Sequence, residues 1–115
     1  TSERLKAVDL TQEMGNVSEP VAEALLKTLN NDPNTNVRLA ALNALTNYAQ
    51  SPRVREGLIA SIERQESPLV QMALAETMAA LQEKRSVKEL RELLQREGTA
   101  PEVKEKIQTS LEALM

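Results

Sequence analysis

The sequence has no cysteine, histidine, phenylalanine or tryptophan, and only one tyrosine among its 115 residues. Without cysteine there is no disulfide, no thiolate metal site and no thiol nucleophile. Without histidine the chain also lacks the commonest general base and the commonest metal ligand. The apolar residues make up 41% of the chain and are almost entirely aliphatic. This composition favours closely packed helices over a β-sandwich, which draws on aromatic and β-branched residues.

Membrane-spanning and targeting segments are also missing from the sequence. No apolar run approaches the roughly 18 residues of a membrane span, and no signal peptide is present. The chain begins at Thr1 rather than at methionine, so we expect a fragment of a longer protein, which could itself carry a membrane anchor. The 14 basic and 17 acidic residues give a net charge of −3, which concerns solubility rather than fold.

Apolar residues recur at intervals of 33 positions in three segments of the chain. The matching sets are Val37, Val70 and Val103; Ala41, Leu74 and Ile107; Leu45, Met78 and Leu111; and Tyr48, Leu81 and Leu114. Internal periods of about 20 to 50 residues are typical of architectures whose units stack along one axis. Within each segment the apolar residues follow three- and four-residue steps, which predict helices.

The predicted fold is all-α, an α-solenoid in which antiparallel helix pairs stack into a right-handed superhelix. About seven helices are expected, near residues 3–14, 19–30, 36–50, 52–65, 68–84, 87–96 and 100–114. Ser51 and Ser67 each precede a proline and are predicted N-caps. Ser86 and Thr99, each followed three residues later by a glutamate, have the spacing of a capping box.

The chain is predicted to be a single repeat domain over residues 1–115. Its parts are a half repeat, 1–17, and three full repeats, 18–50, 51–85 and 86–115. The first helix resembles the second helix of a pair, because Arg4, Ala7, Leu10 and Met14 align at a spacing of 34 with Arg38, Ala41, Ala44 and Tyr48. Each repeat buries its apolar face only against its neighbours. The unpaired first helix therefore implies lost upstream material or a cap.

The first full repeat carries a motif formed by Asp32-Pro33, Val37-Arg38, Ala41 and Ala44-Leu45. This order resembles the HEAT-repeat pattern, in which an aspartate precedes a Val-Arg step that opens the second helix of a pair. The resemblance covers about residues 18 to 115. The second repeat departs from it, with Gln65 and Gln71 in place of the aspartate and arginine, and the third carries Lys104 and lacks the aspartate. The resemblance thus implies an Asp–Arg ladder that is broken after one rung.

A second resemblance rests on the runs Pro52-Arg53-Val54-Arg55-Glu56-Gly57-Leu58-Ile59, Glu66-Ser67-Pro68-Leu69-Val70-Gln71 and Pro101-Glu102-Val103-Lys104-Glu105. These runs are similar to the helical tails of certain bacterial envelope proteins. In that group an anti-sigma-like zinc-finger region and a membrane span precede a HEAT-like domain outside the inner membrane. The similarity implies a periplasmic sensor or interaction domain of a membrane-anchored protein, and a cytoplasmic location is the alternative.

Catalytic and metal-binding groups are sparse. The pairs Glu89/Glu92 and Glu102/Glu105 lie near first helical turns, where acids favour the helix dipole. Acid–base catalysis would instead need a carboxyl whose pKa is moved towards neutrality. The serines have no histidine to activate them, and the loop 30–36 offers one aspartate, too few for a metal bound by oxygen atoms. We therefore predict a protein that is not an enzyme and has no catalytic residue, metal or cofactor.

Nucleic-acid binding is an alternative function because arginines are frequent. The candidates are Arg38, Arg53, Arg55, Arg64, Arg85 and Arg91. Phosphate binding calls for a continuous basic stripe, usually with aromatic stacking platforms. Here acidic residues interleave with the arginines and the net charge is negative, so nucleic acid is not the expected partner. A further alternative is the accessory domain of an enzyme, which would hold a small molecule.

The predicted partner site lies on the second helix of each pair, opposite the core stripe. Its candidate residues are Leu39, Asn43, Thr46, Met72, Glu76, Glu105 and Thr109. Extended faces of this kind are what solenoids use for binding. Leu39 and Met72 are apolar at equivalent positions, so they either form one exposed patch or are buried by the curvature of the stack. The predicted function is a non-catalytic scaffold or sensor domain that binds a protein or peptide through this face.

Overall fold

The computed structural model describes residues 18–115, and within this range the chain is built from helices joined by short turns. The elements are α2 (Glu19–Asn31), α3 (Thr35–Thr46), α4 (Pro52–Ile62), α5 (Pro68–Ala80), the short 3-10 helix η1 (Lys84–Ser86), α6 (Val87–Gln95) and α7 (Pro101–Leu114). The predicted helix 3–14 and the half repeat 1–17 lie outside the described residues. Over residues 18–115 the predicted all-α fold is confirmed, with six α-helices at the expected places.

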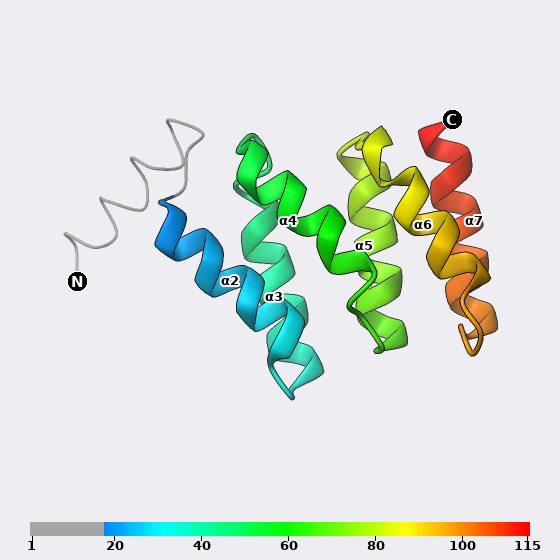
Figure 1. Cartoon of the computed structure of the whole chain (residues 1–115), viewed down its shortest axis with the longest axis horizontal. Coiled ribbons are helices and arrows are strands. Elements are labelled where there is room, and N and C mark those ends of the chain that lie inside the picture. Colours follow the sequence, from blue (N-terminus) through cyan, green and yellow to red (C-terminus); the bar gives the residue numbers. More distant parts are fainter. Residues whose placement is uncertain (1–17) are drawn as a thin grey trace.

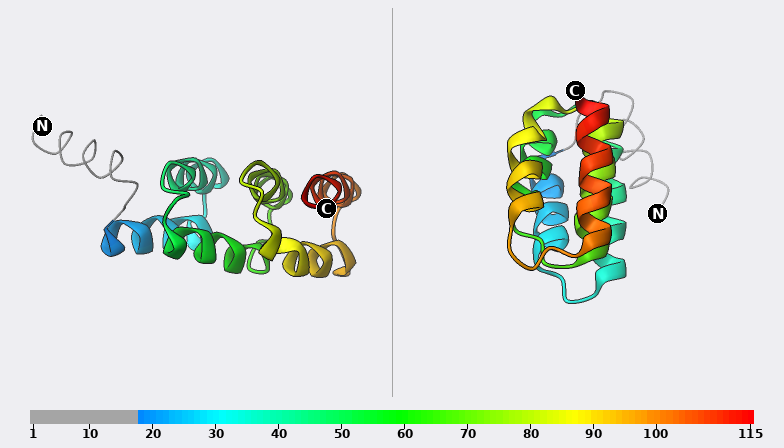
Figure 2. Two further views of the ribbon diagram at one scale, coloured as in Figure 1. Left: turned by 90° about the horizontal axis from the view of Figure 1, so that it is seen from above. Right: turned by 90° about the vertical axis from the view of Figure 1, so that its right-hand side faces the viewer.

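The helices form two layers of an α-solenoid. Figure 2 shows α2, α4 and α6 side by side in one layer and α3, α5 and α7 in the other. Within each layer every helix contacts the next, so that α2 packs on α4, α4 on α6, α3 on α5 and α5 on α7. Successive helix pairs thus follow one another along the long axis of the molecule (Figure 1).

The 33-residue register explains most of the core. Leu45, Leu74 and Met78 are completely buried. Tyr48 is also buried, as its register predicts. Two members of the register differ, because Val37 is 41% exposed and Leu81 is half-buried. The periodicity therefore identifies equivalent positions correctly, but it does not show whether each position has a neighbouring repeat to cover it.

Helices α3 and α5 end earlier than predicted. After Thr46 the backbone of α3 tightens, and the N–H of Tyr48 donates to the carbonyl of Leu45 at 3.0 Å. This three-residue spacing keeps Tyr48 facing the core after the regular helix has ended. Helix α5 ends at Ala80 because Gln82 takes a left-handed conformation with φ of 53°. That conformation turns the chain away in a Schellman-type cap.

The predicted caps are confirmed only in part. The hydroxyl of Ser51 accepts the N–H of Val54 at 3.4 Å, as an N-cap does. Ser67 occupies the N-cap position of α5, but its side chain makes no capping bond. The two capping boxes are wrong, because the hydroxyls of Ser86 and Thr99 instead donate to carbonyls earlier in the chain, at 2.7 and 2.9 Å.

A buried glutamine joins the first two repeats where the ladder motif is interrupted. Gln65 has no exposed surface. Its side-chain oxygen accepts a hydrogen bond from Arg38, and its amide donates to the side-chain oxygen of Asn30 at 2.7 Å and the carbonyl of Ser61 at 3.1 Å. The amide of Asn30 in turn donates to the hydroxyl of Ser61 at 3.1 Å. The second repeat therefore contributes a neutral hub rather than an aspartate.

The predicted Asp32–Arg38 rung is wrong. Among residues 18–115 no ion pair joins these two side chains. Asp32 instead accepts the backbone N–H of Asn34 at 2.8 Å and stabilises its own loop. The Nε of Arg38 donates to the carbonyl of Leu29 at 2.9 Å, which directs the guanidinium towards Gln65.

The same hub also reaches the third repeat. The backbone carbonyl of Gln65 accepts hydrogen bonds from the side chains of Gln71 and Arg96, both at 2.9 Å. Arg96 also donates to the carbonyl of Glu63 at 2.7 Å. Gln65 thus connects three consecutive repeats.

Candidate partner-binding face

All seven predicted site residues lie on the layer formed by α3, α5 and α7. Helix α3 carries Leu39, Asn43 and Thr46, helix α5 carries Met72 and Glu76, and helix α7 carries Glu105 and Thr109. Four of them are exposed, namely Asn43, Glu76, Glu105 and Thr109, and the other three are half-buried. We call the outer surface of these three helices the partner face.

Helices α3 and α5 enclose a groove of about 220 Å³ on this layer. Its lining residues are Leu39, Leu42, Asn43, Thr46, Ala73, Glu76 and Thr77. The fold therefore brings together predicted residues of the first and second repeats. The remaining three, Met72, Glu105 and Thr109, do not line the groove.

Sequence reasoning missed three residues of the groove, Leu42, Ala73 and Thr77. Leu42 is buried and has the pattern of a core residue. Ala73 and Thr77 are short side chains, and they leave the space that the groove occupies. The small size of Ala73 and Thr77 could have indicated a groove in the sequence. A small residue is equally typical of a close helix crossing, so it does not distinguish the two.

Leu39 and Met72 are both half-buried and pack against the core cluster. Only Leu39 also lines the groove. A different residue supplies exposed apolar surface at the start of α5, because Leu69 is 56% exposed. The partner face thus combines a recessed apolar floor with one projecting leucine.

Both hydroxyl groups that line the groove are bonded within their own helices. Thr46 donates to the carbonyl of Asn43 at 2.6 Å, and Thr77 donates to the carbonyl of Ala73 at 2.7 Å. Glu76 pairs with Lys106 of α7 at 2.6 Å, and both side chains are well exposed. Exposed pairs of this kind contribute little to stability and exchange readily with other charges. The amide of Asn43 and the carboxylate of Glu76 are therefore the polar groups that the rim presents to solvent.

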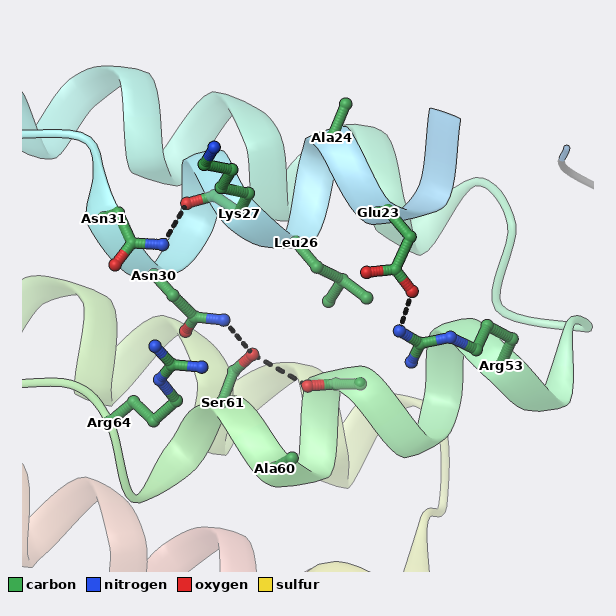
Figure 3. A pocket seen from close by; sticks show the side chains of 11 residues that line it. Glu23, Ala24, Leu26, Lys27, Asn30, Asn31, Arg53, Ala60, Ser61 and Arg64 are labelled. Atoms are coloured by element: carbon green, nitrogen blue, oxygen red, sulfur yellow. Dashed lines mark hydrogen bonds and ion pairs between the residues drawn. The ribbon is translucent and has the colours of Figure 1, made fainter. Parts of the chain in front are cut away.

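A larger groove of about 440 Å³ lies in the opposite layer, between α2 and α4 (Figure 3). Two pairs of its side chains contact each other across the two helices, the exposed ion pair of Arg53 with Glu23 and the hydrogen bond from Asn30 to Ser61. The crossing is close because α4 carries Gly57, where a Cβ would collide with Leu26. These features identify the α2–α4 groove as a joint between repeats.

Glu83 of the η1 turn has a strongly shifted pKa. Its side chain is nearly buried, and it accepts hydrogen bonds from Arg85 at 2.9 and 3.0 Å and from Arg55 at 3.2 Å. The bonds from Arg85, followed by that from Arg55, outweigh burial and lower the pKa of the carboxyl from 4.5 to about 2. A carboxyl held ionised in this way cannot donate a proton at neutral pH, so its role is structural.

We predict that the Glu83 cluster makes stability depend on pH at the acidic end. Because the pKa of Glu83 is lower in the folded chain, its contribution is present above pH 4.5 and disappears as the pH falls towards 2. Glu83→Gln should lower the free energy of unfolding at pH 7 by about 2 kcal/mol and flatten the curve across this range. Urea unfolding at several pH values measures both effects. Glu63→Gln, at an exposed position, is the control, and an unchanged acid dependence in Glu83→Gln would contradict the assignment.

Several arginines that suggested nucleic-acid binding serve the fold instead. Arg38 binds Gln65, and Arg85 pairs with Glu83. Arg55 donates to the carbonyls of Ala49 and Leu81 as well as to Glu83. Guanidinium groups held in this way contact their own chain rather than a phosphate. Within the described part of the chain, the arginines therefore do not add up to a continuous basic stripe.

Residues 18–115 offer no cluster suited to a metal ion, since no three acidic, histidine or cysteine side chains gather there. None of the helices in this range combines the length and the apolar character needed to cross a membrane.

Comparison with known proteins agrees with the architecture. The family model of HEAT repeats matches residues 22–112, which is most of the chain and spans all three helix pairs. Comparison with curated proteins and with solved structures gives no match. HEAT repeats commonly mediate protein–protein interaction or scaffolding. With its two helical layers, its 33-residue register and this match, the chain belongs to the HEAT-repeat family.

Proposed function

We propose that this chain is a non-catalytic interaction domain that binds a protein or peptide through the partner face. The observation that supports the proposal is the groove between α3 and α5, which has an apolar floor and a polar rim. An apolar recess surrounded by polar groups is typical of interaction sites.

The size of the groove favours a side chain of a protein over a small molecule. Pockets for drug-sized ligands usually measure about 300–1,000 Å³, whereas this groove measures about 220 Å³. One apolar side chain of a partner would rest on Leu39 and Ala73. The partner's polar groups would then meet Asn43 and Glu76 at the rim.

Glu76 gives the rim a preference for positive charge. Its present partner, Lys106, is a flexible surface residue on the next helix. A lysine or arginine of a bound segment could replace Lys106 without leaving a buried charge unpaired. The proposed ligand is therefore a segment with an apolar anchor next to a basic residue.

The experiment introduces bulk and charge at the rim. Asn43→Arg places a long cation over the groove, so we expect binding of the captured partner to weaken at least about tenfold. Ala60→Arg is the matched control, because Ala60 is exposed on α4 and lines the α2–α4 groove. Affinity capture with the immobilised chain, followed by titration of the partner, measures the effect. Equal loss in both variants, or loss in Ala60→Arg alone, would contradict the proposal.

The resemblance to the HEAT-like tails of membrane-anchored envelope proteins supports a narrower proposal. In that setting the domain would act as a periplasmic sensor, and the captured partner would be an envelope protein. Fusion of the full-length protein to a reporter that is active on only one side of the membrane tests this location. Reporter activity in the cytoplasm would contradict it.

A further inference from the structure

The first helix pair exposes apolar residues that the next pair buries. Val21 on α2 is 45% exposed, whereas Val54, its equivalent on α4, is completely buried. Val37 on α3 is 41% exposed, whereas Val70, its equivalent on α5, is completely buried. The same residue type at the same repeat position thus has opposite surroundings in the two pairs.

The difference follows from the packing order of the stack. Helix α2 covers α4, and α3 covers α5. Leu26 of α2 lies directly over Gly57 of α4, and the position equivalent to Gly57 on α2 is Ala24, which is exposed. Leu25 is likewise half-buried where its equivalent Leu58 has no exposed surface. No element among residues 18–115 covers this side of α2 and α3, which we call the N-terminal edge.

Polar residues are exposed at the opposite end of the described stack. Gln108 on α7 is exposed at the position where α3 has the buried Leu42 and α5 has the buried Ala75. Arg91 and Glu92 are exposed on the neighbouring helix α6. Terminal repeats with a polar outer face cap a solenoid. Helices α6 and α7 expose polar residues of this kind, whereas the N-terminal edge, at the other end of the stack in Figure 1, exposes apolar ones.

We propose that residues 1–17 of this chain lie against the α3 side of the N-terminal edge. Their apolar residues Ala7, Leu10 and Met14 recur at helical spacing and align at a spacing of 34 with the stripe of α3. A twelve-residue helix would be about 18 Å long, enough to lie along α3, which also has 12 residues. The segment is joined directly to α2, so its effective concentration at the edge is high. This contact is separate from the partner face.

The absence of cysteine allows a clean test with single thiols in the full chain. Val37→Cys places a thiol on the N-terminal edge, and Gln108→Cys places the control at an exposed position of α7. We expect a maleimide to label Val37→Cys at least about tenfold more slowly than Gln108→Cys, because a covered thiol reacts only when the cover opens. Adding Leu10→Asp should bring the labelling rate of Val37→Cys up to that of the control. Equal rates without Leu10→Asp would overturn the proposal.

A second measurement separates coverage by residues 1–17 from coverage by a second copy of the chain. Leu10→Cys combined with Ala44→Cys, the α3 residue with which Leu10 aligns, should form a disulfide within one chain, at a rate independent of protein concentration. Leu10→Cys with Gln108→Cys should not. Disulfides between chains, or protection that grows with concentration, would place a second copy at the edge and overturn the proposal. Val70→Cys lies in the core, so fast maleimide labelling of this thiol would show that Leu10→Asp has unfolded the chain. In that case the disulfide measurement decides whether residues 1–17 cover the edge.

Discussion

Replacing Gln65 with alanine is expected to lower the free energy of unfolding by about 3 kcal/mol. The side chain is completely buried and binds Arg38, Asn30 and the carbonyl of Ser61. Alanine would leave the guanidinium of Arg38 and the carbonyl oxygen of Asn30 without these partners in a poorly hydrated place. Unpaired buried polar groups each cost about 1–3 kcal/mol.

Urea unfolding followed by circular dichroism measures this loss. Gln50→Ala is the matched control, because Gln50 is exposed in the turn after α3, and its effect should stay within about 0.5 kcal/mol. A loss below about 1 kcal/mol in Gln65→Ala would show that the network is not essential. The network would then not be what joins the repeats.

Leu74→Ala is expected to destabilise the chain by about 3–4 kcal/mol. Leu74 is completely buried in α5, the helix that contacts both α3 and α7. Removing its side chain forfeits the transfer free energy and leaves a cavity in the middle of the stack. Leu69→Ala makes the same substitution on the same helix where the side chain is 56% exposed. That control should cost well under about 1 kcal/mol, and similar losses in both variants would contradict the packing described for α5.

The sequence was sufficient to predict the helices and most of the core. The 33-residue register identified Leu45 and Met78 because helical periodicity and burial produce the same pattern in each repeat. It could not predict that Val37 is exposed, since exposure depends on whether a neighbouring helix is present. Similarly, the sequence showed only that an aspartate is missing at Gln65. The hydrogen bonds that replace it join residues about 30 positions apart and become visible only in three dimensions.

The same register predicted part of the candidate site, and the prediction was incomplete for a physical reason. Asn43 and Glu76 were identified because they lie opposite the core stripe on equivalent helices. Ala73 was not, because a small residue gives the same signal whether it forms a groove or a close crossing. The position of the groove depends on how far apart α3 and α5 lie, and this spacing is set by side chains of both helices together.

The most direct test of the proposed function is site-specific photo-crosslinking from the partner face. A photoreactive amino acid is placed at Asn43 in one chain and at Ala60 in another. Both positions are exposed and lie on opposite layers. We expect the chain modified at Asn43 to crosslink one defined partner protein, identified by mass spectrometry, and the chain modified at Ala60 not to crosslink it. Crosslinking of that partner from Ala60 and not from Asn43 would contradict the account.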